Sequence, residues 1–284
     1  GPTFMQGDIA ISSKRSAIAC PGNTCLWPKS VDGHVYIPYI LSPQYNDFDR
    51  IIIETGMQDI STGTCVRFVP RTHEANYLDI QPKFGCWSYL GLNGGAQQLS
   101  LQTPGCMWSG VASHELMHAL GFVHEQSRSD RDEYVTIMWE NILKDREHNF
   151  DKYETNNLNA PYDYGSIMHY GKYAFSEDGA PTIIPKPDPN ILIGQRDGPS
   201  TTDLMKINRL YDCGQAGPQQ SLCLHYLRAP IHNPHAALQA SIMRLSRCDA
   251  DHQCTGDTLP IADSPSLCCP SQFPSPPWVL LALT

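Results

Sequence analysis

The sequence has no apolar run that approaches the roughly twenty residues needed to cross a bilayer, and the apolar stretch at residues 278–283 is far too short. We therefore predict no membrane span. Basic residues are also scarce, with 20 Lys and Arg against 29 Asp and Glu and a formal net charge of -9. Because nucleic-acid phosphates bind to basic surfaces, this balance argues against a nucleic-acid partner. No basic and then apolar leader opens the chain, so we expect any signal peptide to have been removed already.

The 11 cysteines include no Cys-x-x-Cys pair, the close spacing that is typical of metal and redox sites in cytosolic proteins. A cysteine content this high without such pairs indicates disulfides formed in an oxidising compartment. We therefore expect a secreted, extracellular protein, and storage in secretory granules is compatible with that expectation. With 284 residues, of which 41% are hydrophobic, the chain can bury a sizeable core in one or two domains.

Three closely spaced histidines carry the strongest chemical signal. His114 and His118 are four residues apart, so on a helix both imidazoles project from one face and can hold a single ion. Gly121 can take a positive φ that ends the helix and lets His124 reach the same ion. Three nitrogen ligands leave Zn²⁺ an open position for water, as in catalytic sites. Glu115 lies beside that position and can act as the general base.

A second pattern follows at residues 166–170, which read Ser-Ile-Met-His-Tyr. The combination of HExxHxxGxxH with a later Met-containing turn is typical of metzincins. Met168 taken alone would be interpreted as an ordinary core methionine. We interpret His169 as a core residue, because its neighbour Tyr170 fits a role at the metal better.

The chain resembles the astacin family of zinc endopeptidases. In that family a Glu follows the third His, matched by Glu125, and the Met-turn reads SxMHY, as at residues 166–170. The resemblance covers roughly residues 4–213 and is greatest for the six-cysteine hatching-enzyme branch. It implies an α+β, metzincin-type catalytic domain of two subdomains, with a mixed sheet and helices above a zinc cleft and a loop-rich lower half.

The resemblance also implies roles for individual residues. One Zn²⁺ per chain would be held by His114, His118 and His124. Tyr170 would ligate the zinc at rest and swing away to bind the oxyanion, the alternative being a core tyrosine with a bonded hydroxyl. Glu125 would contact the N-terminus of the processed enzyme.

The implied substrate is an extended polypeptide or glycoprotein bound along a sheet edge. Likeness to the hatching-enzyme branch points to egg-envelope glycoproteins. Two alternatives stay open at this point: a general extracellular astacin for digestion or matrix processing, and a binding protein with a relic protease domain. The oligomeric state is not predicted.

Residues 1–15 are interpreted as a remnant pro-segment that ends in the dibasic Lys14-Arg15. Gly7-Asp8 resembles the family's pro-segment motif, in which an aspartate occupies the open position on zinc. Asp8 would then be an inhibitory ligand. The family usually has Phe where Met5 stands here, and the alternative is an ordinary exposed N-terminus.

We expect a catalytic domain over residues 16–213 and a Pro- and Cys-containing, poorly ordered tail over residues 214–284. In the tail, only residues 235–247 show apolar residues at helical spacing. The disulfide pairs implied by the resemblance are Cys65 with Cys213, Cys86 with Cys106, and Cys20 with Cys25.

Local patterns also predict the elements of the catalytic domain. Ser42 and Pro43 are suitable cap and first-turn residues for a helix that ends before Gly63. Further helices are expected over residues 111–120, 140–152 and 200–211, and strands over residues 65–69, 77–80 and 98–102.

Overall fold

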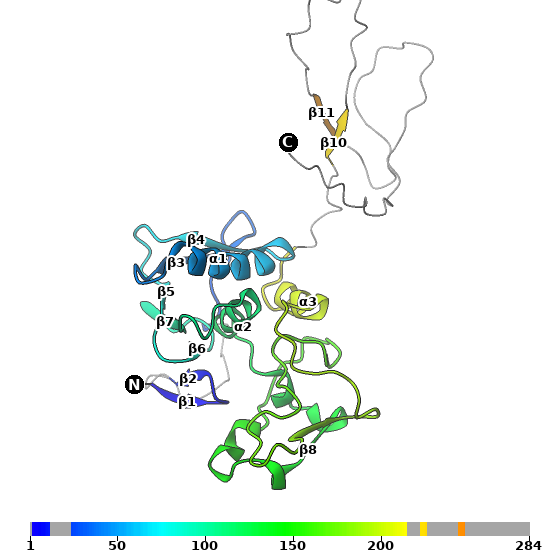
Figure 1. Cartoon of the computed structure of the whole chain (residues 1–284). Helices are drawn as coiled ribbons and strands as arrows, with labels where there is room; N and C mark the ends of the chain where they lie inside the picture. The colour runs from blue at the N-terminus through cyan, green and yellow to red at the C-terminus, as the bar shows by residue number, and fades with distance from the viewer. Residues whose placement is uncertain (1, 12–23, 215–221, 226–243, 248–284) are drawn as a thin grey trace, which may run out of the picture. The chain divides into compact units, whose positions relative to one another are not determined.

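The computed structural model describes residues 2–11, 24–214, 222–225 and 244–247 (Figure 1). The chain divides after Gly214 into two compact units. In the second unit, β10 (Leu222–His225) pairs antiparallel with β11 (Arg244–Arg247). The regular element suggested by helical spacing over residues 235–247 is therefore not helical in its last four residues, which pair as a strand. Residues 235–243 lie outside the described part.

The first unit contains a mixed sheet that has seven strands among the described residues. The strand order is β1-β2-β6-β7-β5-β3-β4. Strands β3, β4, β5 and β7 run parallel to one another, whereas β6 runs antiparallel to β7. The strands are β1 (Thr3–Met5), β2 (Ile9–Ile11), β3 (Val35–Leu41), β4 (Val66–Pro70), β5 (Tyr77–Gln81), β6 (Cys86–Tyr89) and β7 (Ala96–Leu101).

Helix α1 (Asp47–Thr62) begins later than the sequence predicted. Its N-cap is Asn46, whose side chain accepts a hydrogen bond from the Asp49 N–H while the Asp49 carboxylate accepts from the Asn46 N–H. The predicted start at Ser42 and Pro43 is wrong, because the Ser42 N–H donates to the Ile80 carbonyl (2.9 Å) and so prolongs the strand pairing of β3 with β5. The reciprocal capping pair at Asn46 is the signal that determines the helix start.

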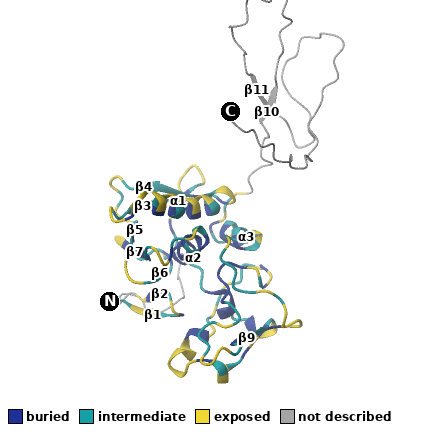
Figure 2. Ribbon diagram, in the orientation of Figure 1, coloured by how far each residue is buried: buried dark blue, intermediate teal, exposed yellow. Residues whose placement is uncertain are grey.

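The main core lies between the sheet and the helices α1, α2 (Ser109–Ala119) and α3 (Thr201–Leu210). The buried faces of α1 and α2 turn toward the sheet and toward each other (Figure 2). Fully buried side chains that fill this core include Ile37, Ile53, Leu78, Leu99 and Leu116. Burial of such side chains contributes roughly 1.5–3 kcal/mol each and fixes α2 against the sheet.

The second half of the unit is rich in loops and contains a smaller core around Phe150 and Ile183. The predicted helix over residues 140–152 is wrong in type, because the segment forms two short 3₁₀ helices, Trp139–Asn141 and Lys144–Phe150. Between them Ile142 forms a β-bridge with Ser176, and this pairing pulls the backbone out of the helical conformation. Strands β8 (Val135–Ile137) and β9 (Ile183–Pro185) pair antiparallel nearby.

Disulfides join Cys65 to Cys213 and Cys86 to Cys106, two of the pairs that the resemblance implies. The first closes a loop of 148 residues, which restricts the unfolded chain strongly. Cys25 is also disulfide-bonded, but Cys20 lies outside the described residues, so their pairing stays a prediction. No helix in the described part of the chain is long and apolar enough to cross a membrane.

Candidate metal centre

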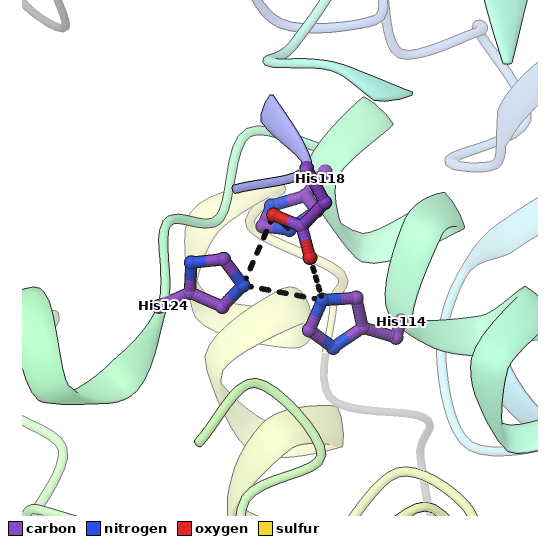
Figure 3. A group of neighbouring side chains, drawn as sticks. His114, His118 and His124 are labelled. Atoms are coloured by element: carbon purple, nitrogen blue, oxygen red, sulfur yellow. Dashed lines mark hydrogen bonds and ion pairs between the residues drawn. The ribbon is translucent and has the colours of Figure 1, made fainter. Parts of the chain in front are cut away.

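Helix α2 presents two histidines on one face, and the turn after it supplies a third. Gly121 takes a φ of +108°, a conformation that favours glycine, and it redirects the chain so that His124 faces His114 and His118. The three imidazoles converge on one point (Figure 3). One nitrogen atom from each ring and a carboxylate oxygen of Asp8 all lie within 4.8 Å of one another.

Each of the three imidazoles donates a hydrogen bond from its Nδ1 atom to an oxygen. These bonds run from His114 to the Ile167 carbonyl (2.8 Å), from His118 to the Phe122 carbonyl (2.7 Å) and from His124 to the Gln6 side-chain oxygen (2.9 Å). Each Nδ1 therefore carries the ring proton, and each Nε2 presents a lone pair to the centre of the cluster. Lone pairs and a carboxylate that face one another call for a cation between them. Imidazole nitrogens and carboxylate oxygens are ligands of Zn²⁺, so the residues fit this metal.

The hairpin of β1 and β2 brings Asp8 onto the three histidines. The Asp8 carboxylate oxygens lie 3.2 to 3.4 Å from the three Nε2 atoms. Gln6 and Gly7 form the turn with φ values of +50° and +82°. A Cβ on Gly7 would lie 2.8 Å from the Phe175 ring, so this turn requires glycine. The carboxylate consequently occupies the fourth position around the centre.

Glu115 lies on α2 next to His114 and is 1% exposed. Its Oε2 atom has no hydrogen-bond partner among the described residues. Burial raises the pKa of the Glu115 carboxyl well above its usual range, and the nearby Asp8 carboxylate raises it further. A buried carboxyl with a free oxygen beside the metal centre is suited to exchanging protons with a water molecule or a substrate.

The segment 166–170 joins the metal centre to the core. The Ile167 carbonyl holds His114, and the Met168 carbonyl accepts the Glu125 N–H (3.0 Å). Met168 is 2% exposed and belongs to the main core. The Tyr170 hydroxyl donates to the Gln6 carbonyl, and its ring lies beside that of His124 with the ring centroids 4.5 Å apart. Its role as a zinc ligand at rest stays a prediction.

Comparison with known proteins agrees with this geometry. A family model described as Astacin, a peptidase family, matches residues 24–212. The chain belongs to the astacin family. It is therefore a zinc metalloendopeptidase that acts on polypeptides, and its three-histidine cluster is of the kind that holds the catalytic zinc of astacins.

Several relatives share about half of their residues with this astacin. High choriolytic enzyme 1 of Oryzias latipes is 50% identical over 211 residues, which cover 74% of this chain and 78% of that protein. Its solved structure, described as a hatching enzyme zinc-protease, superimposes with a TM-score of 0.68 over 70% of this chain and all of that one. Embryonic protein UVS.2 of Xenopus laevis is 44% identical over 94% of this chain and 54% of its own length. This match extends into the residues after 214, where the sequence resemblance had been expected to end.

The structure gives Glu125 of this astacin a partner that the sequence did not predict. Its carboxylate accepts a hydrogen bond from the ammonium group of Lys206 on α3 at 2.5 Å. The expected partner, the N-terminus of the processed enzyme at Ser16, lies outside the described residues. That contact therefore stays a prediction, and Lys206 is a residue of the site that no local pattern indicated.

Gln6 and Arg196 also lie at the metal centre without having been predicted. Gln6 bonds both His124 and Tyr170, as described above, and its side chain is 1% exposed. Arg196, which is partly exposed, donates to the His169 carbonyl, and its charge lowers the pKa of Glu115. Neither position has a distinctive sequence pattern, since Gln6 lies in a short turn and Arg196 lies in a loop far along the chain. His169 is buried and accepts from the Tyr162 hydroxyl (2.8 Å), as a core residue should.

Proposed function

We propose that this astacin is a secreted hatching-enzyme-type protease that hydrolyses egg-envelope glycoproteins once residues 1–15 are removed. The main support is the intact metal centre with Glu115 beside it, in a chain 50% identical to a protein named a choriolytic enzyme. The disulfides fit an extracellular site of action. A general role in digestion or matrix processing is the alternative. The relic-protease interpretation is not supported, because every residue expected at the metal centre is present.

The substrate would bind along β6. Without β1 and β2, β6 is the edge of the sheet, because its other neighbour is β7. In the structure β2 pairs with β6, and the Ser88 N–H donates to the Asp8 carbonyl (3.0 Å). An extended polypeptide would make main-chain hydrogen bonds with the same edge. The hairpin thus covers the groups that a substrate needs.

The chemistry follows from the positions of Glu115 and Tyr170. When bound, zinc supplies Lewis acidity, which makes a water molecule more acidic and polarises a peptide carbonyl. Glu115 would take a proton from the attacking water and pass it to the leaving amine. The Tyr170 hydroxyl, released from the Gln6 carbonyl, would donate a hydrogen bond to the oxyanion of the scissile peptide. These roles require that the hairpin leaves the metal centre and the edge of β6.

Residues 1–15 would therefore keep the enzyme latent in two ways. The Asp8 carboxylate occupies the position that water needs at the metal, and the backbone of β2 occupies the edge of β6. Lys14 and Arg15 lie outside the described residues, so cleavage after Arg15 remains part of the proposal.

The Asp8→Ala variant of the uncut chain should be more active than the uncut wild type by at least about tenfold, equivalent to about 1.4 kcal/mol. It should nevertheless be less active than the chain trimmed after Arg15, because β2 still covers β6. Hydrolysis of a fluorogenic peptide measures all three forms. Asp145→Ala, which removes an exposed carboxylate, is the matched control and should change nothing. Equal activity before and after trimming, with Asp8→Ala silent, would show that residues 1–15 have no inhibitory role.

The trimmed enzyme should release peptides from isolated egg envelope faster than from collagenous matrix. The reason is its 50% identity over 211 residues to a protein named a choriolytic enzyme. Mass spectrometry of the soluble fraction identifies the cleaved proteins, and the Glu115→Gln variant controls for contaminating proteases. Preferential cleavage of the collagenous matrix would favour the alternative role in matrix processing.

A further inference from the structure

The Glu125 carboxylate is fully engaged by groups of the described chain. Its Oε2 atom accepts from the Lys206 ammonium at 2.5 Å. Its Oε1 atom accepts from Arg128 at 3.1 Å and from the Asp163 N–H at 2.9 Å. The side chains of Glu125 and Lys206 are only 5% and 7% exposed. A buried carboxylate with three donors needs no further partner.

The cations that bond Glu125 lie in a small group of ion pairs. Arg128 forms a two-bond ion pair with the Asp130 carboxylate, at 2.9 and 2.8 Å, in addition to its bond with Glu125. Two cations, Arg128 and Lys206, therefore face two carboxylates, Glu125 and Asp130. Another ammonium group brought to Glu125 would have to displace a donor that is already bonded to it at a buried site.

Lys206 connects α3 to the metal centre through Glu125. Glu125 follows the ligand His124 directly, and its N–H is bonded to the Met168 carbonyl. One turn earlier on α3, the Asp203 carboxylate accepts from the Ser166 hydroxyl (2.6 Å) and the Ile167 N–H (2.9 Å). Lys206 and Asp203 are three residues apart, so the same stretch of α3 fixes the third ligand and the Met-turn together.

We propose that Lys206 is a positioning residue that supplies the ammonium partner of Glu125 from within the folded domain. The trimmed enzyme then does not depend on which residue forms its new N-terminus. This differs from the expectation for the family, in which the processed terminus provides the contact. The inference rests on the proposed latency in one respect: activity is measured after residues 1–15 have been removed.

The first test compares trimmed enzymes with different N-termini. Chains that begin at Ser16, at Ala17, or at Ser16 preceded by an added Gly-Ser should have kcat/KM values that agree within about twofold. A loss of tenfold or more on extension of the terminus, with Lys206 intact, would overturn the proposal. If the Ser16 form is no more active than the uncut chain, the proposed latency fails, while the comparison among termini still decides the role of Lys206.

The second test changes the ion pair itself. Lys206→Met should lower kcat/KM by about tenfold or more for every terminus and speed the transfer of zinc to a chromophoric chelator, because Glu125 is left undercompensated beside His124. Lys206→Arg should recover part of both losses, since it restores the charge. The double variant Glu125→Gln/Lys206→Met should retain zinc better than Lys206→Met alone, because no unpaired carboxylate remains.

Lys152→Met is the matched control, since Lys152 forms a 2.7 Å ion pair with Asp132 at an exposed site. It should leave activity and zinc release unchanged. Far-UV circular dichroism and disulfide mapping verify that each variant is folded. Wild-type zinc retention and activity in folded Lys206→Met would overturn the proposal.

Discussion

Replacing Glu115 with Gln should lower kcat/KM of the trimmed enzyme by a factor between about 10² and 10⁴ and leave zinc bound. The amide has nearly the shape of the carboxylate but cannot take a proton from the attacking water. Glu115 is outside the group of metal ligands, so its replacement leaves the three histidines in place. The loss should fall mainly on kcat, because the residue acts on the reacting atoms and not on the bound backbone at β6.

The measurement is a progress curve with a fluorogenic peptide, combined with elemental analysis of the same sample. Glu133→Gln makes the same chemical change at an exposed position and should have no effect. Retention of more than a tenth of the wild-type kcat/KM by a zinc-loaded Glu115→Gln enzyme would exclude the proposed role as a proton carrier.

The metal centre could be predicted because its signal is local. Four residues separate His114 from His118, and this spacing alone places both rings on one face of α2. The turn after α2 could also be predicted, because glycine at position 121 readily adopts the positive φ that the structure shows. Only His124 must be brought in by the turn, and Gly121 is the residue that redirects the chain toward the other two rings.

The features that could not be predicted depend on contacts between distant parts of the chain. Ser42 has the properties of a helix cap, but its N–H is taken by Ile80, so α1 begins after Asn46 instead. The bridge of Ile142 to Ser176 similarly breaks a segment that the sequence predicted to be helical. Tertiary pairing overrides local propensity in both cases.

The same reason explains the residues of the site that the sequence did not reveal. Lys206 is one of several polar residues on an amphipathic helix, and only the packing of α3 brings it to Glu125. Gln6 contacts His124 through a hairpin that pairs with β6, which is far away in the sequence. Motifs report the groups that perform the chemistry, whereas the residues that orient those groups come from anywhere in the fold.

The His118→Ala variant should lose zinc. Loss of a residue that only supports a ligand lowers metal affinity by up to about 100-fold, so loss of the ligand itself should lower zinc affinity by more than that. His118 is fully buried, the Phe122 carbonyl holds its Nδ1 atom, and its Nε2 atom points to the centre of the cluster, 3.4 Å from the Asp8 carboxylate that trimming removes. Two nitrogen ligands and water cannot replace the third ring, and peptidase activity should disappear with the metal.

Elemental analysis of the trimmed chain should give one zinc per wild-type chain and none for His118→Ala after dialysis. The exposed His73→Ala variant is the control and should keep its zinc. Disulfides Cys65–Cys213 and Cys86–Cys106 should remain intact in both, because they lie in the main core and not at the cluster.

The His118→Ala variant should also unfold at a lower temperature than the zinc-loaded wild type, since a ligand that binds only the folded state adds its binding free energy to stability. A His118→Ala chain that keeps stoichiometric zinc would show that the metal is held by some other set of residues, and the assignment of the three histidines would then be wrong.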